Sequence, residues 1–224
     1  MTIFLASGNR HKQSEVAQIF KPNQILIPAD KGIDFDPLEN GTSFVENSLI
    51  KARALWEIVH EPVIADDSGI CVDLLDGAPG IYSARYAGSC DMKGEKAGSK
   101  LDAPERNRLL VEQTNDALVS FRTKNPKDAR TDAELRSCRF VCAMVLYLGN
   151  GRFYAVQETL EGNLVASIEE SAGSGGFGYD PVVYLPQFGK TVAELSEEQK
   201  NAVSHRGKAG KKLAMLLNSS DLSL

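Results

Sequence analysis

The sequence predicts a mixed α/β fold. Short apolar runs alternate with helical patterns through about the first 75 residues, and two β-rich runs joined by a Gly-Asn-Gly turn follow at residues 138–160. Early β-α alternation combined with a later hairpin is typical of a mixed sheet with packed helices. The length of 224 residues corresponds to one globular domain, or to two small lobes that share a core.

The N-terminal part of the chain predicts a strand–loop–helix unit. An apolar run at residues 2–6 ends at a Gly-Asn turn, and apolar residues at 16, 17, 19 and 20 give the following helix its buried face. A short strand is expected at residues 25–28. A second helix begins behind Ser43 and Glu46, whose spacing is that of a capping box, and it buries residues 49, 52, 56 and 59.

The next elements are strands separated by polar segments. A buried strand at 62–65 is expected to end at Asp66-Asp67-Ser68-Gly69, with another strand at 70–74. Polar stretches at 89–100 and 125–136 are expected on the surface. The remaining predicted elements are a helix at 104–121, strands at 138–148 and 152–160, a glycine-rich loop at 173–176, a turn that enters a strand within 177–184, and a final helix at 207–217.

Composition excludes several classes of protein. A hydrophobic content of 42% and a charged content of 25% fit neither a disordered nor a membrane-spanning chain. The 25 Lys and Arg residues against 30 Asp and Glu give a net charge of −5, which argues against nucleic acid or an anionic membrane as a partner. The four cysteines form no CxxC pair, Cys138 and Cys142 are expected to be buried, and the N-terminus does not resemble a signal peptide. We therefore expect a cytoplasmic protein.

Residues 7–12 (Ser7-Gly8-Asn9-Arg10-His11-Lys12) form a candidate anion site. They follow a strand and open a helix, so backbone N–H groups and the helix dipole favour a phosphate there, with Lys12 as a point charge. The glycine and lysine spacing is not that of a P-loop. An ordinary turn beside a solvated lysine gives the same pattern.

The Asp66-Asp67 pair is a candidate metal or catalytic site. Carboxylates at the end of a buried strand are well placed to hold Mg²⁺ or to activate water, although two loop carboxylates that cap a turn are an alternative. Because successive strand residues point to opposite faces, only one of the two is expected to face a site directly. Glu39 and Glu46 are candidate partners, and the capping box already accounts for Glu46.

Two further segments have the chemistry of base recognition. Phe177-Gly178-Tyr179-Asp180 joins a flat ring to a carboxylate, which suits stacking on a base and accepting its ring N–H. Lys200, Ser204, His205 and Arg206 cluster before the last helix, where His205 and Arg206 can donate to a carbonyl oxygen. Each segment alone is also compatible with a turn or with a solvated helix start.

Read together and in order, these motifs resemble the inosine triphosphate pyrophosphatase family, also called the Ham1 family. The resemblance runs from about residue 3 to 217 and is carried by Asp-Asp-Ser-Gly at 66–69, Phe-Gly-Tyr-Asp-Pro at 177–181 and Ser-His-Arg at 204–206. Residues 89–136 match the family pattern poorly. The resemblance implies one two-lobed domain over residues 1–224, an elongated mixed sheet, a substrate cleft between the lobes, and a homodimer.

The resemblance also implies the reaction and the roles of the residues. The expected reaction is hydrolysis of ITP, dITP or XTP to the monophosphate and pyrophosphate, which would remove deaminated purines from the nucleotide pool. Mg²⁺ would be held by Glu39 and Asp67, and Asp67 would also orient or deprotonate the attacking water. The remaining roles are phosphate binding by Ser7, Gly8, Asn9, Arg10, His11, Lys12 and Ser68, with Lys51 as a weaker addition, and base binding by Phe177, Gly178, Tyr179, Asp180, Lys200, His205 and Arg206.

Two alternatives remain open at this point. A Maf-like pyrophosphatase would share the anion loop and the carboxylates, but it should lack the Phe-Gly-Tyr-Asp and Ser-His-Arg segments. A nucleotide-binding protein that has lost catalysis would bind ITP tightly without turnover, and the presence of both Glu39 and Asp67 argues against it.

Overall fold

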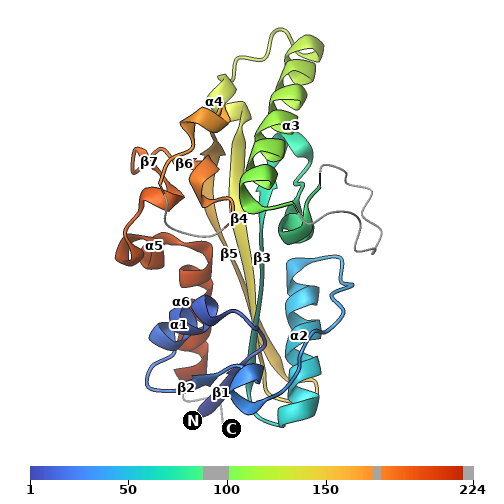
Figure 1. Ribbon diagram of the computed structural model, residues 1–224, viewed down its shortest axis with the longest axis vertical. Coiled ribbons are helices and arrows are strands. Elements are labelled where there is room, and N and C mark those ends of the chain that lie inside the picture. The colour runs from blue at the N-terminus through green and yellow to red at the C-terminus, as the bar shows by residue number, and fades with distance from the viewer. Residues whose placement is uncertain (88–100, 174–177, 219–224) are drawn as a thin grey trace. The chain divides into compact units, whose positions relative to one another are not determined.

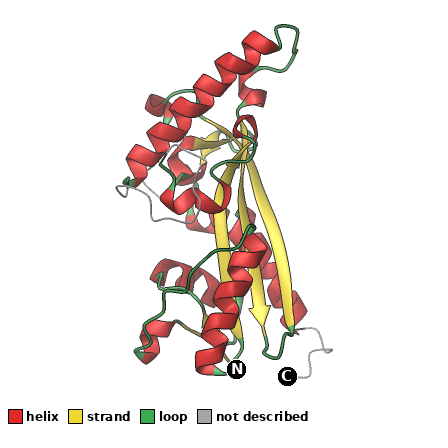
Figure 2. Cartoon of the chain, turned by 90° about the vertical axis from the view of Figure 1, so that its right-hand side faces the viewer, coloured by secondary structure: helices red, strands yellow, loops and turns green. Residues whose placement is uncertain are grey.

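A computed structural model describes residues 1–87, 101–173 and 178–218. It contains one seven-stranded sheet whose strand order is β2-β1-β3-β4-β5-β6-β7. Helices pack beside the strands (Figure 1 and Figure 2). The predicted mixed α/β class is confirmed. The strands are β1 (Thr2–Leu5), β2 (Gln24–Leu26), β3 (Val63–Val72), β4 (Ser137–Tyr147), β5 (Phe153–Leu164), β6 (Val183–Leu185) and β7 (Lys190–Thr191). The α-helices are α1 (Arg10–Ile19), α2 (Phe44–Val59), α3 (Ala103–Lys124), α4 (Asp132–Leu135), α5 (Glu197–Val203) and α6 (His205–Asn218).

The sheet is parallel at one end and antiparallel at the other. Strand β1 pairs in parallel with β2 and β3, and the connections between these strands contain α1 and α2, as parallel pairing requires. Strand β6 pairs antiparallel with β5 and β7. The predicted hairpin is confirmed, and Gly149, Asn150 and Gly151 all have positive φ angles in its turn.

The chain divides into two compact units. Unit 1 comprises Met1–Ser68, Val141–Thr159 and Asn201–Leu224, and unit 2 comprises Gly69–Phe140 and Leu160–Lys200. Strands β3, β4 and β5 therefore each contribute residues to both units.

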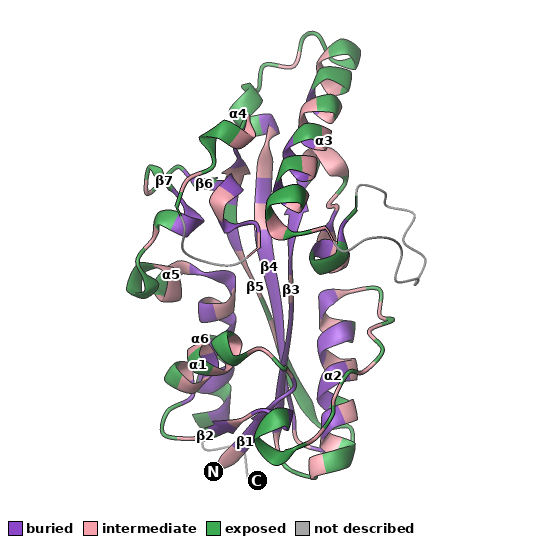
Figure 3. Ribbon diagram, viewed as in Figure 1, coloured by how far each residue is buried: buried purple, intermediate pink, exposed green. Residues whose placement is uncertain are grey.

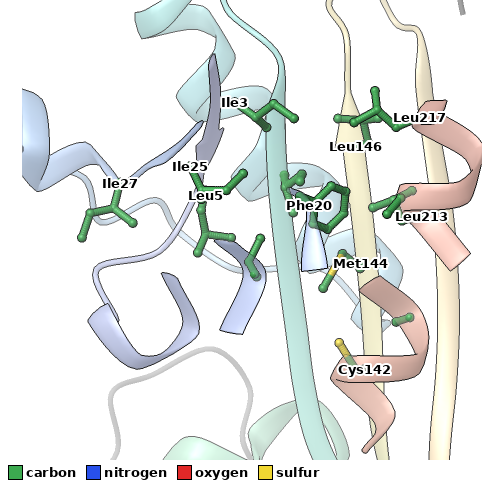
Figure 4. Close-up of a cluster of buried hydrophobic side chains, with 14 residues drawn as sticks. Ile3, Leu5, Phe20, Ile25, Ile27, Cys142, Met144, Leu146, Leu213 and Leu217 are labelled. Atoms are coloured by element: carbon green, nitrogen blue, oxygen red, sulfur yellow. The ribbon is translucent and has the colours of Figure 1, made fainter. Parts of the chain in front are cut away.

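Unit 1 has a hydrophobic core on each face of its strands. On one face, α1 and α6 cover β1, β3 and β4, and their apolar side chains meet around Phe20, Met144 and Leu213 (Figure 4). On the other face, α2 packs against Val63, Ala65 and Val145. Strands β3 and β4 are buried along almost their whole length (Figure 3).

One predicted break in the sheet is wrong. The sequence pattern gives two strands separated at Asp66-Asp67-Ser68-Gly69, whereas β3 runs without interruption from Val63 to Val72. Polar partners on the flanking helices satisfy the two carboxylates, so the backbone does not need to leave the sheet at this point. The two aspartates consequently lie in the middle of a strand and not at its end.

Other predicted elements differ less. The strand expected within 177–184 is confined to β6, because Asp180–Val182 form a 3-10 turn, and a short helix, α4, lies in the polar stretch before β4. Cys138 and Cys142 are buried as predicted, and burial raises the pKa of the Cys142 thiol to about 12. Within the described residues, no helix has the length and apolar character that crossing a membrane requires.

Candidate active site

The middle of β3 carries two adjacent carboxylates with different surroundings. Asp66 contacts Lys12 of α1 and Asp67 contacts Asn47 of α2, and these helices cover opposite faces of the strand (Figure 1). Strand alternation predicts this arrangement, because neighbouring residues of a strand point to opposite faces of the sheet.

Asp66 is the centre of an ion cluster. Its side chain is fully buried, and Lys12 Nζ lies 2.9 Å from Oδ2, while Arg206 Nε and Ser68 Oγ donate to the same oxygen at 3.2 and 3.1 Å. Burial raises the pKa of Asp66, but Lys12, Arg206 and, to a smaller extent, Lys51 outweigh burial and hold it well below its usual range. Asp66 is therefore ionised at neutral pH and anchors Lys12 and Arg206.

Glu15 extends this cluster along α1. Arg206, in the first turn of α6, donates through Nη1 to Glu15 Oε2 at 2.8 Å, and Glu15 Oε1 lies 3.2 Å from His11 Nε2. The guanidinium is thus held by two carboxylates from two elements, which fixes its plane. His205, predicted together with Arg206, is buried at the start of the same helix.

Asp67 is held from α2 by two side chains that lie one turn apart. Asn47 Nδ2 donates to Asp67 Oδ2 at 3.2 Å, and Lys51 Nζ lies 3.5 Å from Oδ1. Burial raises the pKa of Asp67, Lys51 lowers it and the nearby Glu39 raises it, and the net pKa is above the usual value. A carboxyl group with a raised pKa is better suited to accept a proton near neutral pH than Asp66 is.

Glu39 belongs to the segment that precedes α2. Its Oε2 lies 3.3 Å from Lys51 Nζ, so one ammonium group contacts both Glu39 and Asp67. The three carboxylates Asp67, Asp66 and Glu39 raise the pKa of Lys51, although burial lowers it. Lys51, expected as a weaker addition to the phosphate site, contacts both Glu39 and Asp67, which the sequence did not predict.

The donor set of this pair fits a magnesium ion. Among the residues that the structure describes, no group of three or more His, Cys, Asp and Glu side chains has the arrangement of a metal site. Mg²⁺ does not require one, because it commonly takes one or two carboxylates and completes its shell with water and phosphate oxygens. Glu39 and Asp67 supply two such carboxylates, and a divalent cation would relieve the repulsion that helps to raise the pKa of Asp67.

The backbone of the predicted anion loop forms a capped helix start. Asn9 is the N-cap of α1, and its Oδ1 accepts from the N–H groups of His11 and Lys12 at 2.9 and 3.2 Å. Ser7 Oγ accepts from the Asn9 N–H at 3.2 Å. The amides of His11 and Lys12 in the predicted phosphate loop therefore already have an acceptor. Gly8 lies between Ser7 and the N-cap residue Asn9.

The three basic side chains of this loop are also paired. Arg10 contacts Asp30, His11 contacts Glu15, and Lys12 contacts Asp66. The basic side chains of the loop are thus each held in position by a neighbouring carboxylate.

In unit 2, Asp180 and Lys200 form a mostly buried ion pair. Lys200 Nζ lies 2.7 Å from Asp180 Oδ2. Asp180 is predicted to accept an N–H of the base, and Lys200 is predicted to lie beside it. The ion pair places the two side chains in direct contact.

The neighbouring backbone in unit 2 is held by two hydrogen bonds. Tyr179 donates through its hydroxyl to the Ser83 carbonyl at 2.9 Å, and Asn107 Nδ2 donates to the Gly178 carbonyl at 3.2 Å. Burial raises the pKa of Tyr179, so its hydroxyl remains a donor at neutral pH. Phe177, the predicted stacking residue, lies outside the described residues.

Sequence reasoning missed Asn47 and Glu15. Both lie on helices, and both contact site residues at least 20 positions away in the sequence. A usable signal exists only for Asn47, because three polar residues, Asn47, Ser48 and Lys51, interrupt the buried face of α2.

Comparison with known proteins gives consistent matches over nearly the whole chain. The model of the Ham1 family matches residues 3–216. The dITP/XTP pyrophosphatase of Treponema denticola is 48% identical over 209 residues, which cover 93% of this chain and 94% of that protein. The protein of the same name from Desulforamulus reducens is 37% identical over 220 residues, covering 97% and 96% of the two chains.

Solved structures show the same similarity. A HAM1 protein from Coxiella burnetii has 31% sequence identity and a TM-score of 0.77, and the match covers 97% of this chain and 98% of that one. A nucleoside-triphosphatase, dITP/XTP pyrophosphatase, from Mycobacterium abscessus has 32% identity and a TM-score of 0.68 over 97% and 100% of the chains. The alternative of a Maf-like protein is thereby set aside, and the chain belongs to the Ham1 family.

Proposed function

We propose that this chain hydrolyses the triphosphates of deaminated purines, ITP, dITP and XTP, to the monophosphate and pyrophosphate. Family membership and the names of its relatives support this activity. In the reaction, the oxygen of a water molecule bonds to the α-phosphorus, and the bond from that phosphorus to the bridging oxygen breaks. Pyrophosphate leaves, and a carboxylate takes the proton that the water loses.

The contrast between Asp66 and Asp67 is the observation that carries the proposal. Two identical, adjacent side chains have different partners, since Asp66 contacts Lys12 and Arg206 while Asp67 shares Lys51 with the second carboxylate, Glu39. Their pKa values are shifted in opposite directions as a result of these surroundings and of burial. Such a separation of pKa values between neighbouring carboxyl groups is common where one acts as a base and the other is structural. We assign proton acceptance and water orientation to Asp67, and charge anchoring to Asp66 with Ser68.

Glu39 and Asp67 would hold Mg²⁺. When bound, the ion supplies positive charge to the phosphate oxygens and to the developing charge of the leaving group. The chain itself keeps both carboxylates near one buried ammonium group, that of Lys51. Lys51 thus neutralises part of their repulsion before any substrate is present.

Residues 7–12 would hold the phosphate tail, as the family resemblance implies. Their hydrogen bonds favour a preorganised loop, since Asn9 fixes the backbone and Asp66 orients Lys12. Charge held by the protein in this way costs no reorganisation when the phosphates bind.

Selectivity would depend on the 6-position of the purine. Hypoxanthine and xanthine present a carbonyl acceptor there, and adenine presents an amino donor. The Arg206 guanidinium has five N–H donors, and its bonds to Asp66 and Glu15 use two of them, so donors remain for a carbonyl. We assign stacking to Phe177 and acceptance of a ring N–H to Asp180, and we propose, on the resemblance and the cysteine content, a cytoplasmic homodimer.

The test is pyrophosphate release from ITP, dITP, XTP, GTP and ATP, with and without Mg²⁺. We expect rapid release from the first three nucleotides only with Mg²⁺, and slow release from ATP. Equal rates with ATP and ITP would refute the assignment of base selectivity. Tight ITP binding with no pyrophosphate under any condition would instead identify a binding protein that lacks catalysis.

A further inference from the structure

Asn47 connects the two parts of the chain that carry the carboxylates of the candidate magnesium site. It is 1% exposed, its Nδ2 donates to Asp67 Oδ2 at 3.2 Å, and its Oδ1 accepts from the Gly41 backbone N–H at 2.9 Å. Gly41 lies two residues after Glu39. A single buried amide therefore joins strand β3 to the segment that carries Glu39.

Gly41 packs so closely on Asn47 that a larger residue there would force a neighbouring group to shift. A Cβ atom at Gly41 would lie 2.7 Å from Asn47 Oδ1 and 2.8 Å from Glu46 Cβ, both closer than van der Waals contact allows. The φ angle of Gly41 is not in the left-handed region, so close approach, and not backbone conformation, requires glycine here.

The segment around Glu39 depends on individual contacts for its position. Residues 33–41 contain no helix or strand, so no backbone ladder fixes them. Near Glu39, the segment is tied to α2 by the bond from Gly41 to Asn47, by the contact of Glu39 with Lys51, and by bonds from Thr42 to Glu46. Two of these contacts, those through Asn47 and Lys51, come from side chains that also donate to Asp67, and of the two only Asn47 bonds to the backbone of the segment.

We propose that Asn47 is a positioning residue that sets the separation of Glu39 and Asp67 for a divalent cation. This inference rests on the proposed function. Mg²⁺ demands near-ideal octahedral geometry, so two carboxylates from different segments must be held at a fixed spacing to bind it well. The amide does this without contacting the ion, because each of its ends orients one of the two segments.

Two variants remove this link from opposite ends. Asn47→Leu keeps the branched shape of the side chain but removes both hydrogen bonds, and Gly41→Ala pushes the segment away from Asn47 without changing the chemistry of the amide. Ser48→Ala is the matched control, because Ser48 is buried on the same helix and donates to the Ala143 carbonyl at 2.9 Å. It loses one buried hydrogen bond that has no connection to Asp67.

The probe is Mn²⁺, which shares the preference of Mg²⁺ for oxygen ligands and is followed by its paramagnetic resonance signal without substrate. We expect Asn47→Leu and Gly41→Ala each to raise the Kd for Mn²⁺ by about 10-fold to 100-fold, as loss of an outer hydrogen bond to a metal ligand commonly does. The Mg²⁺ concentration for half-maximal pyrophosphate release should rise by the same factor, while Ser48→Ala leaves both values unchanged.

The double variant distinguishes a shared link from two separate lesions. If both changes break one connection, the combined loss equals that of Asn47→Leu alone. Wild-type affinity in Asn47→Leu, or losses that multiply in the double variant, would overturn the inference and leave the proposed function intact. A wild-type protein that binds no Mn²⁺ and needs no Mg²⁺ would overturn the magnesium proposal and this inference with it. If Asn47→Leu does not fold, the Kd of Gly41→Ala for Mn²⁺ is compared with that of Ser48→Ala. Equal values for these two variants would overturn the inference.

Discussion

Asp66→Asn and Asp67→Asn should have opposite effects, although they are the same substitution at adjacent positions. Asp66 neutralises Lys12 and Arg206, whose side chains are only 19% and 16% exposed, so its loss leaves two largely buried cations short of a partner. Removing one member of a buried ion pair costs about 3–5 kcal/mol, and the lower end applies because Arg206 keeps Glu15. For a chain of this size, about 3 kcal/mol corresponds to a Tm lower by about 6–12 °C.

Asp67→Asn should not destabilise the fold. The pKa of Asp67 is raised by burial and Glu39, so the folded state disfavours the ionised carboxylate and a neutral isostere removes that cost. Pyrophosphate release should fall by about 10²-fold to 10⁴-fold, the usual contribution of a general base.

Urea unfolding followed by fluorescence measures both variants. The only tryptophan, Trp56, lies in unit 1 with both aspartates, so its signal reports the relevant part of the chain. We expect Asp66→Asn to lower the midpoint with an unchanged slope, and Asp67→Asn to match or exceed the wild type. A midpoint for Asp66→Asn equal to that of the wild type, or equal losses in the two variants, would refute the assignment of separate roles.

Three further predictions follow from the same contacts. The pKa of Asp66 in the folded state lies below its unfolded value of about 3.9, so the ionised side chain stabilises the fold fully at pH 7 and less as the pH falls below about 4. The urea midpoints of the wild type and Asp66→Asn should therefore converge in acid. Arg206→Ala should reduce pyrophosphate release from ITP more than from ATP, and equal losses would make Arg206 a phosphate contact. Gly149→Ala should lower stability by about 1–3 kcal/mol more than Gly151→Ala in thermal unfolding. Both glycines have positive φ angles, but only at Gly149 would a Cβ atom lie 2.4 Å from Trp56. Similar Tm values for the two variants would contradict this prediction.

Local sequence patterns predicted the elements whose causes are local. The spacing of Ser43 and Glu46 predicts the start of α2, and Ser43 Oγ does accept from the Glu46 N–H at 3.2 Å. Glu46, however, accepts from Thr42 at 2.6 Å. The Gly-Asn-Gly turn similarly predicted the hairpin, because positive φ angles at those residues are a local property.

The parts that failed depend on partners distant in sequence. Asp66-Asp67-Ser68-Gly69 resembles a turn, but Lys12 and Asn47 satisfy the carboxylates from two helices, so the strand continues. The role of Asn47 could not be predicted for the same reason, since its contacts lie 6 and 20 residues away. Strand alternation still predicted the opposite faces of Asp66 and Asp67 correctly, because that rule needs no partner.

The core around Phe20 has a consequence for how the chain is made. Ile3 and Leu5 from the first strand share this cluster with Leu213 and Leu217 from the last helix (Figure 4). During synthesis, the first strand therefore emerges about 200 residues before the helix that covers it, and early folding of an N-terminal portion cannot complete this core. Loss of α6, through a stop codon or proteolysis, would uncover apolar side chains of this cluster such as Ile3 and Leu5, and exposed apolar surface promotes aggregation.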